Sequence, residues 1–199
     1  MFDKYEVYTV TQSIYCYEDT KILKNKLNIK TAELLKEAED EITTKRIAEL
    51  AFRPITGNFS PTQLMNIHRY ILGDVYKFAG KTRKEDIYKG RTRFMPNNLI
   101  NDELVKLLNK LKEERYLKGF SREDFVRKLA YYMAELNIIH QFREGNGRTI
   151  REFIRLLANE NGYFLDWSKL KKKELLDATI DSYLDATALQ KCLGKALEG

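Results

Sequence analysis

One segment of the 199-residue chain gathers residue types that can do chemistry: HQFREGNGRTIR, residues 140–151. Its Gly145-Asn146-Gly147 turn allows backbone N–H groups to converge, and the start of a following helix would add the positive end of its dipole. Arg148 and Arg151 lie three residues apart and so share one face of that helix. Together these features predict a binding site for phosphate groups.

Two further side chains bring reactive groups to the same segment. Glu144 is an acid inside a positive environment, and a Mg²⁺ ion that bridges phosphate oxygens would account for it. His140 stands at the mouth of the loop, where an imidazole with an ordinary pKa of ~6.5 accepts a proton at neutral pH. A histidine base, a metal-binding acid and a triphosphate site favour nucleotidyl or phosphoryl transfer to a hydroxyl.

Three other interpretations of the segment are weaker. A Walker loop needs GxxxxGK[ST] after a strand, and this segment has neither feature. A dinucleotide-binding fingerprint needs GxGxxG inside a strand–helix–strand unit, whereas a helix is expected before this loop. His140 and Glu144 have a spacing that can chelate a transition metal, but no third ligand is apparent.

The elements that must hold this loop are mainly helical. Apolar periodicity predicts helices over about 34–51, 60–80, 101–117, 121–140 and 148–162, and then one or two short helices. Ser60, Pro61 and Gln63 form a capping-box start for the second of these. Gly90, between short segments of β-type residues, predicts a hairpin with its turn near residues 89–92. We therefore expect one all-α domain over residues 1–199, with one small hairpin.

Composition excludes several classes of protein. Lys and Arg number 35 against 29 Asp and Glu, and the net charge of +6 permits an anionic partner without requiring one. No apolar stretch approaches the ~20 residues of a membrane span, and no secretory signal is visible. Cys16 and Cys192 could form a disulfide, but a reduced cytoplasmic protein is favoured. With two histidines and no CxxC pair, a structural zinc site is not expected.

The segment resembles the signature of the Fic family, HxFx[DE]GNGRxxR, at every fixed position. The matching residues are His140, Phe142, Glu144, Gly145, Asn146, Gly147, Arg148 and Arg151. Similarity continues through residues 74–90 and the N-terminal YEDTKILKNKLNIK, and so covers effectively the whole chain. Gln141 stands where most members have proline, which affects the stiffness of the loop rather than the reaction. The implied Fic fold is a helical bundle around a central helix–loop–helix, with active-site loop 140–148.

The resemblance implies transfer of AMP from ATP to a hydroxyl side chain of a target protein. His140 would deprotonate the hydroxyl, and Glu144 would hold Mg²⁺ on the α- and β-phosphates. Arg148 would meet the β-phosphate and Arg151 the γ-phosphate. The other ATP contacts would come from the loop backbone with the Asn146 side chain, the turn before His140, the flap and the helix start: Lys89, Asn137, Ile138, Ile139, Arg143, Gly145, Asn146, Gly147 and Thr149.

The resemblance also implies that the hairpin, over about residues 86–96, is a flap that holds the target by strand addition. Its arginines could steer an acidic target, or could keep an edge strand from aggregating. The docking residues would be Ile87, Tyr88, Lys89, Gly90, Arg91, Thr92, Arg93, Phe94 and Met95.

Regulation is expected to come from a second protein. Many Fic enzymes are inhibited by a helix bearing [ST]xxxE[GN], whose Glu pairs with the second motif arginine, here Arg151. Residues 44–49 contain a Thr and a Glu, but the two are one residue further apart than the motif requires. Residues 194–199, on an expected terminal helix, have the right Glu-Gly spacing, but Gly194 stands where the motif has Ser or Thr. The chain therefore resembles the class I toxins, which implies a small separate antitoxin whose Glu faces Arg151.

The class I resemblance also implies a bacterial, cytoplasmic toxin. Its targets would be the ATPase subunits of DNA gyrase and topoisomerase IV, with no direct nucleic-acid partner and no membrane. Two alternatives stay open. One is a Fic-fold transferase of another phosphate-containing group, such as a protein kinase, although the intact GNG favours AMP. The other is a non-catalytic basic binding module. Such a module would be expected to carry a basic face interleaved with aromatic residues, and this sequence shows none, which argues against it.

Two side chains near the motif have a second, simpler interpretation. His68, on an apolar helix face, is expected to be a core histidine with satisfied nitrogens rather than a residue that lines the site. The backbone of Arg143 belongs to the anion site, but its side chain is expected to be solvated.

Overall fold

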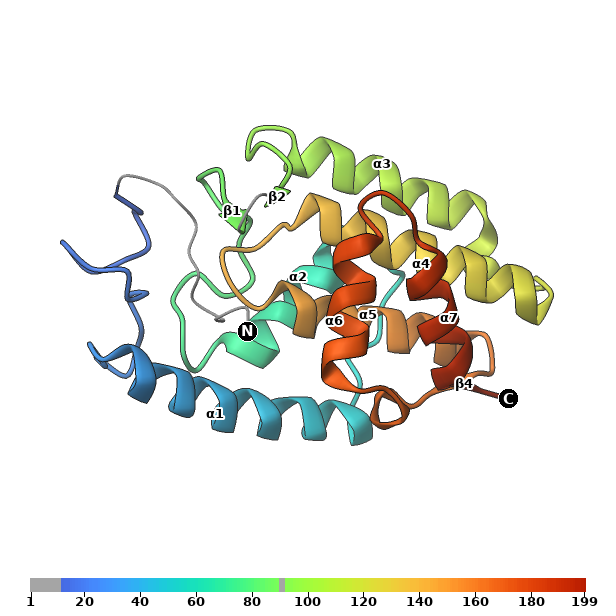
Figure 1. The fold of residues 1–199 in the computed structure, drawn as a ribbon, viewed down its shortest axis with the longest axis horizontal. Coiled ribbons are helices and arrows are strands. Elements are labelled where there is room, and N and C mark those ends of the chain that lie inside the picture. Colours follow the sequence, from blue (N-terminus) through green and yellow to red (C-terminus); the bar gives the residue numbers. More distant parts are fainter. Residues whose placement is uncertain (1–11, 90–91) are drawn as a thin grey trace.

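The computed structural model describes residues 12–89 and 92–199, and within them helices dominate (Figure 1). The helices are α1 (Ala32–Phe52), α2 (Pro61–Leu72), α3 (Ile100–Glu113), α4 (Arg122–Ile139), α5 (Asn146–Glu160), α6 (Lys172–Asp181) and α7 (Thr187–Ala196). Short 3₁₀ turns cover Arg115–Leu117 and Trp167–Lys169. The expected all-α class is confirmed. None of the helices in the described ranges is long and apolar enough to cross a lipid bilayer.

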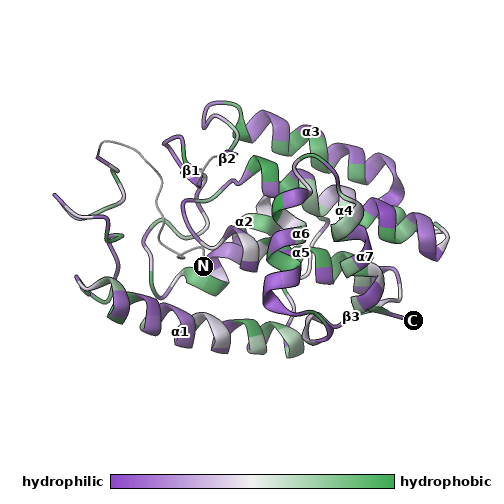
Figure 2. Cartoon of the chain, viewed as in Figure 1, coloured by the Kyte–Doolittle hydropathy of each residue, from purple (hydrophilic) through white to green (hydrophobic). Residues whose placement is uncertain are grey.

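The helices α4 and α5 form the centre of the fold, and the loop between them carries the motif. Helices α2 and α4 pack against α5, helices α3 and α7 pack against α4, and α1 lies along α2 (Figure 1). The buried face of α5 contains Ile150, Phe153, Ile154 and Leu157, the spacing of an apolar helix stripe. Along α3, hydrophobic and hydrophilic residues alternate, as expected for an amphipathic outer helix (Figure 2). The loop is therefore held at both ends by buried helices.

The start of α2 is the predicted cap, but its end is not where the periodicity placed it. The Ser60 hydroxyl accepts from Gln63 N, while the Gln63 side chain accepts from Phe59 N at 2.6 Å instead of closing the box. The helix ends at Leu72 and not near Gly80. Val75 is buried although it lies beyond the helix, in a turn where its own N–H donates to the Leu72 carbonyl. Its burial continued the apolar pattern, and the predicted helix was therefore too long.

The predicted hairpin is confirmed as β1 (Tyr88–Lys89) and β2 (Thr92–Arg93), which pair antiparallel with Lys89 opposite Thr92. Gly90 and Arg91 lie outside the described residues. A second strand pair, β3 (Phe164–Leu165) with β4 (Leu197–Glu198), was not predicted. Glu198 therefore lies on a strand rather than on the expected terminal helix.

Three smaller expectations also have an outcome. The helix predicted over 101–117 stops at Glu113, because the chain then takes positive φ angles over residues 115–117. The helix expected from about Arg148 begins two residues earlier, at Asn146. Cys16 and Cys192 are both free and buried, so the two thiols do not form a disulfide.

Candidate active site

The active-site loop begins at His140, which caps α4 in the left-handed conformation, with φ of 46° and ψ of 59°. A buried arginine, Arg83, holds this turn. Its guanidinium donates to the carbonyl oxygens of His140 (2.9 Å), Glu85 (2.7 Å) and Met95 (2.5 Å). One side chain thus fixes the end of α4 and the end of the flap relative to each other.

Two neighbours orient the imidazole of His140. Its Nδ1 lies 3.1 Å from the carbonyl oxygen of Asn137, so Nδ1 carries the hydrogen and the Nε2 lone pair is available. The ring stacks on Phe94 of the flap, with centroids 3.7 Å apart. Burial, together with the positive charges of Arg83 and Lys89, lowers the pKa of His140 to about 3. The neutral form, which can accept a proton, is therefore the form present at physiological pH.

Gly145 brings the loop directly against α2. Its φ of +79° lies in the left-handed region, and a Cβ built there would lie 2.0 Å from Leu72 Cδ1. Glycine alone combines this conformation with this approach. The loop is therefore seated on α2 by a contact that leaves no room for a side chain.

His68 of α2 supports the same loop. Its Nε2 donates to the carbonyl oxygen of Glu144 at 2.8 Å, and its Nδ1 accepts from the N–H of Gly80 at 2.7 Å. The ring stacks on Phe142, with centroids 3.7 Å apart, and burial lowers the pKa of His68 to about 3. His68 is thus a buried histidine with both nitrogens bonded, as expected, and it also holds the loop backbone.

The Asn146 side chain ties the loop to itself. Its Oδ1 accepts from Phe142 N at 2.8 Å and its Nδ2 donates to Phe142 O at 2.7 Å. The predicted donation to an anion would have to use the second hydrogen of Nδ2. Thr149 is fully buried, and its hydroxyl donates to Gly145 O at 3.0 Å. Both side chains therefore support the loop, while the first-turn N–H groups of α5 have no partner inside the helix.

Glu144 and Arg148 lie together at the start of α5. Glu144 Oε1 accepts from Gly145 N at 2.9 Å and lies 3.4 Å from an Arg148 guanidinium nitrogen. Arg148 is also bound by Glu39 and Thr43 of α1, at 2.5 Å and 3.0 Å. Burial alone would lower the pKa of Arg148, but the carboxylates of Glu39 and Glu144 together outweigh it and raise the pKa.

Arg151 differs from Arg148 in its surroundings. Its guanidinium lies over Gly147, where an added Cβ would be 3.3 Å from Nη1. Among residues 12–89 and 92–199 it has no carboxylate partner, and burial with the charge of Arg148 lowers its pKa to about 10. A partly buried cation without a counter-ion is unfavourable, so this position is suited to an incoming anion.

The described flap residues divide into anchors and exposed positions. Ile87 and Phe94 are buried, and Met95 N donates to Ile138 O at 3.2 Å, which joins the flap to the last turn of α4. Tyr88, Lys89 and Thr92 are partly exposed and Arg93 is exposed. Ile87 is thus an anchor of the flap rather than a contact surface.

The last turn of α4 borders a groove of about 460 Å³. Ile138, Glu135 and Tyr131 line its α4 side, and residues 182–186, between α6 and α7, line the other together with the start of α7. Asn137 faces α6, with Nδ2 3.5 Å from Thr179 O, while Ile139 is buried. Of the residues expected beside adenosine, the structure thus brings Ile138 to an open surface.

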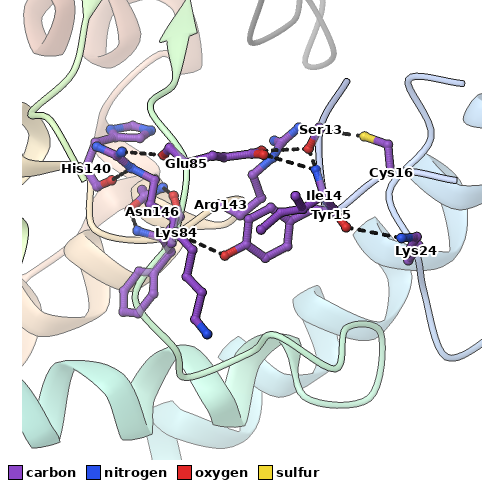
Figure 3. Close-up of polar contacts among 12 residues, drawn as sticks. Ser13, Ile14, Tyr15, Cys16, Lys24, Lys84, Glu85, His140, Arg143 and Asn146 are labelled. Atoms are coloured by element: carbon purple, nitrogen blue, oxygen red, sulfur yellow. Dashed lines mark hydrogen bonds and ion pairs between the residues drawn. The ribbon is translucent and has the colours of Figure 1, made fainter. Parts of the chain in front are cut away.

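Arg143 points away from the mouth of the loop. Its Nε donates to Glu85 at 3.0 Å, and both side chains are buried. Glu85 in turn accepts from Ser13 Oγ at 2.6 Å and Ile14 N at 3.2 Å (Figure 3). The expectation that the Arg143 side chain is solvated is wrong, because this ion pair joins the loop to the N-terminal segment.

Sequence reasoning missed Glu39, Thr43 and Glu85 as parts of the site. One signal was present: Glu39 and Thr43 repeat at helical spacing between Leu35 and Leu50, on the buried face of α1. Polar residues on a buried helix face need partners, but the sequence does not say which partners.

Taken together, the loop offers a neutral histidine base, a carboxylate and two arginines at the start of a helix. This arrangement defines the class of protein as a helical transferase of phosphate-containing groups, because it can bind a polyphosphate and accept the proton of a hydroxyl.

Comparison with known proteins agrees with this class. The Fic/DOC family model matches residues 58–158. The chain is 35% identical to "Probable protein adenylyltransferase Fic" of Escherichia coli K12, over 92% of this chain and 91% of that protein. It is 38% identical to "Protein adenylyltransferase VbhT" of Bartonella schoenbuchensis, over 90% of this chain but only 37% of VbhT.

Among solved structures, the BepC protein of Bartonella tribocorum with bound AMPPNP superposes with a TM-score of 0.87 at 26% identity, over 92% of this chain and 96% of that one. The Fic domain of a Bartonella quintana effector with bound ADP gives 0.86 at 27% identity, over 92% and 94%. The chain belongs to the Fic/DOC family, and within it to the enzymes of the protein adenylyltransferase group.

Proposed function

We propose that this protein transfers AMP from ATP to a hydroxyl side chain of another protein. The observation that carries the proposal is Arg151, a partly buried cation at the start of α5 that has no counter-ion in the described chain. A nucleoside triphosphate would supply that charge. Relatives that the chain matches over most of its length are named adenylyltransferases, which favours transfer of AMP over transfer of phosphate.

The chain's own residues account for the reaction. The target hydroxyl oxygen attacks the α-phosphorus, the bond from that phosphorus to the β-bridging oxygen breaks, and diphosphate leaves. The proton of the hydroxyl passes to His140 Nε2, which is unprotonated because Nδ1 holds the hydrogen against Asn137 O. The first-turn N–H groups of α5 and Arg148 and Arg151 stabilise the charge that develops on the phosphates.

The residues present also fit a Mg²⁺ ion. Glu144 is a partly buried carboxylate beside Arg148, and Mg²⁺ is commonly held by one or two carboxylates together with substrate phosphates. Bound there, the ion would neutralise phosphate charge.

Adenosine and target would approach from two sides of His140. The groove beside Ile138 is the place we assign to adenosine, because Ile138 is only two residues from the base, His140. The hairpin β1–β2 offers a strand edge on the other side, and Arg83 holds its end against the carbonyl oxygen of His140. An extended target segment would pair with that edge and present its hydroxyl to Nε2.

We further propose that the protein acts as a toxin in the bacterial cytoplasm. The targets would be the ATPase subunits of DNA gyrase and topoisomerase IV, and a small antitoxin would block the γ-phosphate position by setting a Glu against Arg151. Support comes from the absence of a carboxylate partner for Arg151 among residues 12–89 and 92–199, and from the lack of an inhibitory helix motif in the sequence. A co-expressed antitoxin that left ATP binding and growth arrest unchanged would contradict this role.

Labelled ATP tests the reaction. The protein and its His140→Ala variant are each incubated with bacterial lysate and ATP labelled at either the α- or the γ-phosphate. We expect α-label on a protein band with the unaltered protein and none with the variant. Transfer of γ-label alone would show kinase chemistry, and no transfer in a lysate that contains the topoisomerases would favour a binding module.

A further inference from the structure

Glu39, in the middle of α1, is a buried charge far from the motif in sequence. Its side chain has no exposed surface, and it forms an ion pair with Arg148 that spans 109 residues of sequence. Such a pair rarely adds stability compared with well-packed apolar residues, because both charges must give up water. Its presence next to the loop therefore calls for an explanation other than folding.

The contacts of Glu39 form a rigid mount for Arg148. Glu39 accepts hydrogen bonds from Arg148 Nη2 and from the Tyr76 hydroxyl, and Arg148 Nη1 donates to Thr43 one turn along α1. Tyr76 is itself buried. Both terminal nitrogens of the guanidinium are thus hydrogen-bonded to residues of α1, and this helix sets its orientation.

The mount leaves Arg148 able to bind. An arginine has five N–H donors, and the contacts to Glu39, Thr43 and Glu144 leave donors over for a ligand. Among the described residues, Arg151 has no carboxylate partner of this kind. The two motif arginines therefore differ, because Arg148 is pre-oriented by α1 and Arg151 is not.

We propose that Glu39 is a positioning residue for the nucleotide, one that holds Arg148 in the orientation that receives the β-phosphate. This inference rests on the proposed function, because it assumes that the loop binds ATP. It makes α1 part of the nucleotide site and predicts a loss confined to ligands that have a β-phosphate.

Binding of ATP, ADP and AMP to the full chain, measured by calorimetry with Mg²⁺, tests the proposal. Glu39→Gln and Glu39→Ala are expected to weaken ATP and ADP about tenfold, the size of one misplaced charge-assisted hydrogen bond, and to leave AMP unchanged. Glu41→Gln, at an exposed position on the same helix, is the matched control and should change nothing. Thr43→Val removes one contact and should give the same pattern at smaller size.

Several outcomes would overturn the proposal. Equal weakening of AMP and ADP would show a general distortion of the loop, and unchanged or tighter ATP binding would show that Glu39 does not help Arg148 bind. A double variant separates these from misfolding: in an Arg148→Gln background, Glu39→Gln should have no further effect on ATP binding. If the unaltered protein bound neither ATP nor ADP, the proposed function itself would fail.

Discussion

Two histidines, His68 and His140, are kept neutral by burial and have different tasks. His140 keeps an available lone pair at Nε2, whereas both nitrogens of His68 are bonded, to Glu144 O and Gly80 N. Protonation of His68 would put a hydrogen on Nδ1 and break its bond to Gly80. The same physical condition thus serves proton transfer in one residue and support of the loop in the other.

The low pKa of His68 predicts how stability depends on pH. In the unfolded chain its pKa returns to ~6.5, so below that value the unfolded state takes up a proton that the folded state refuses. The free energy of unfolding should therefore fall as pH is lowered from about 6.5 toward the folded value of about 3. Urea unfolding at a series of pH values measures this slope. In His68→Gln the slope should be smaller, and an equal slope would contradict the assignment.

The stack between Phe94 and His140 predicts a defect in turnover. In Phe94→Ala the imidazole loses a neighbour at 3.7 Å, and we expect kcat to fall about tenfold because the base is less well oriented. The KM for ATP should stay the same, because the phosphate-binding groups lie elsewhere in the loop. Phe164→Ala, at an exposed aromatic residue on β3, is the control. An unchanged kcat in Phe94→Ala would remove the stack from the mechanism.

Single elements explain how a short loop acquires a fixed shape. The loop between α4 and α5 is closed by Asn146, seated on α2 by Gly145 and joined to the flap through Arg83. Of these contacts, only the pairing of Asn146 with Phe142 is local in sequence. The loop and the helices that flank it follow from the pattern of neighbouring residues, and the sequence alone predicted them. The predicted end of α2 was wrong, because a buried turn after the helix continued the apolar pattern.

Two glycines with the same φ test the seating of the loop. Gly145 and Gly162 both have φ of +79°, but only at Gly145 would a Cβ meet another residue, Leu72 Cδ1 at 2.0 Å. Gly162→Ala should cost about 1 kcal/mol of stability, the penalty for a left-handed side chain. Gly145→Ala should cost clearly more and abolish ATP binding. Thermal unfolding of both variants makes the comparison, and equal losses would mean that the loop is not seated on α2.

At the scale of the whole molecule, the site is assembled from residues that are distant in sequence. Arg83 reaches His140 across 57 residues, Glu85 reaches Arg143 across 58, and Glu39 reaches Arg148 across 109. Pattern and spacing act over a few turns of helix, so they could not predict these pairs. That residues 1–199 form one Fic domain stays a prediction, because the family model matches residues 58–158.

The ion pair between Glu85 and Arg143 predicts a large effect on stability. Glu85→Ala leaves the Arg143 guanidinium buried without its carboxylate, and loss of one partner of a buried pair costs about 3–5 kcal/mol. Urea unfolding measures the loss. The double variant Glu85→Ala with Arg143→Met should recover much of it, since no charge is then left buried. A single variant as stable as the parent would show that the N-terminal segment does not depend on this pair.

Arg151 also affects how stable the folded protein is when it is not turning over substrate. An anion that binds only the folded state stabilises it by mass action, by about 2.7 kcal/mol when its concentration is a hundred times its dissociation constant. The unfolding temperature should therefore rise with the concentration of any polyphosphate that reaches this partly buried cation, even one that is not a substrate. The amount of folded enzyme would then follow the energy charge of the cell, and starvation would expose the chain to proteases.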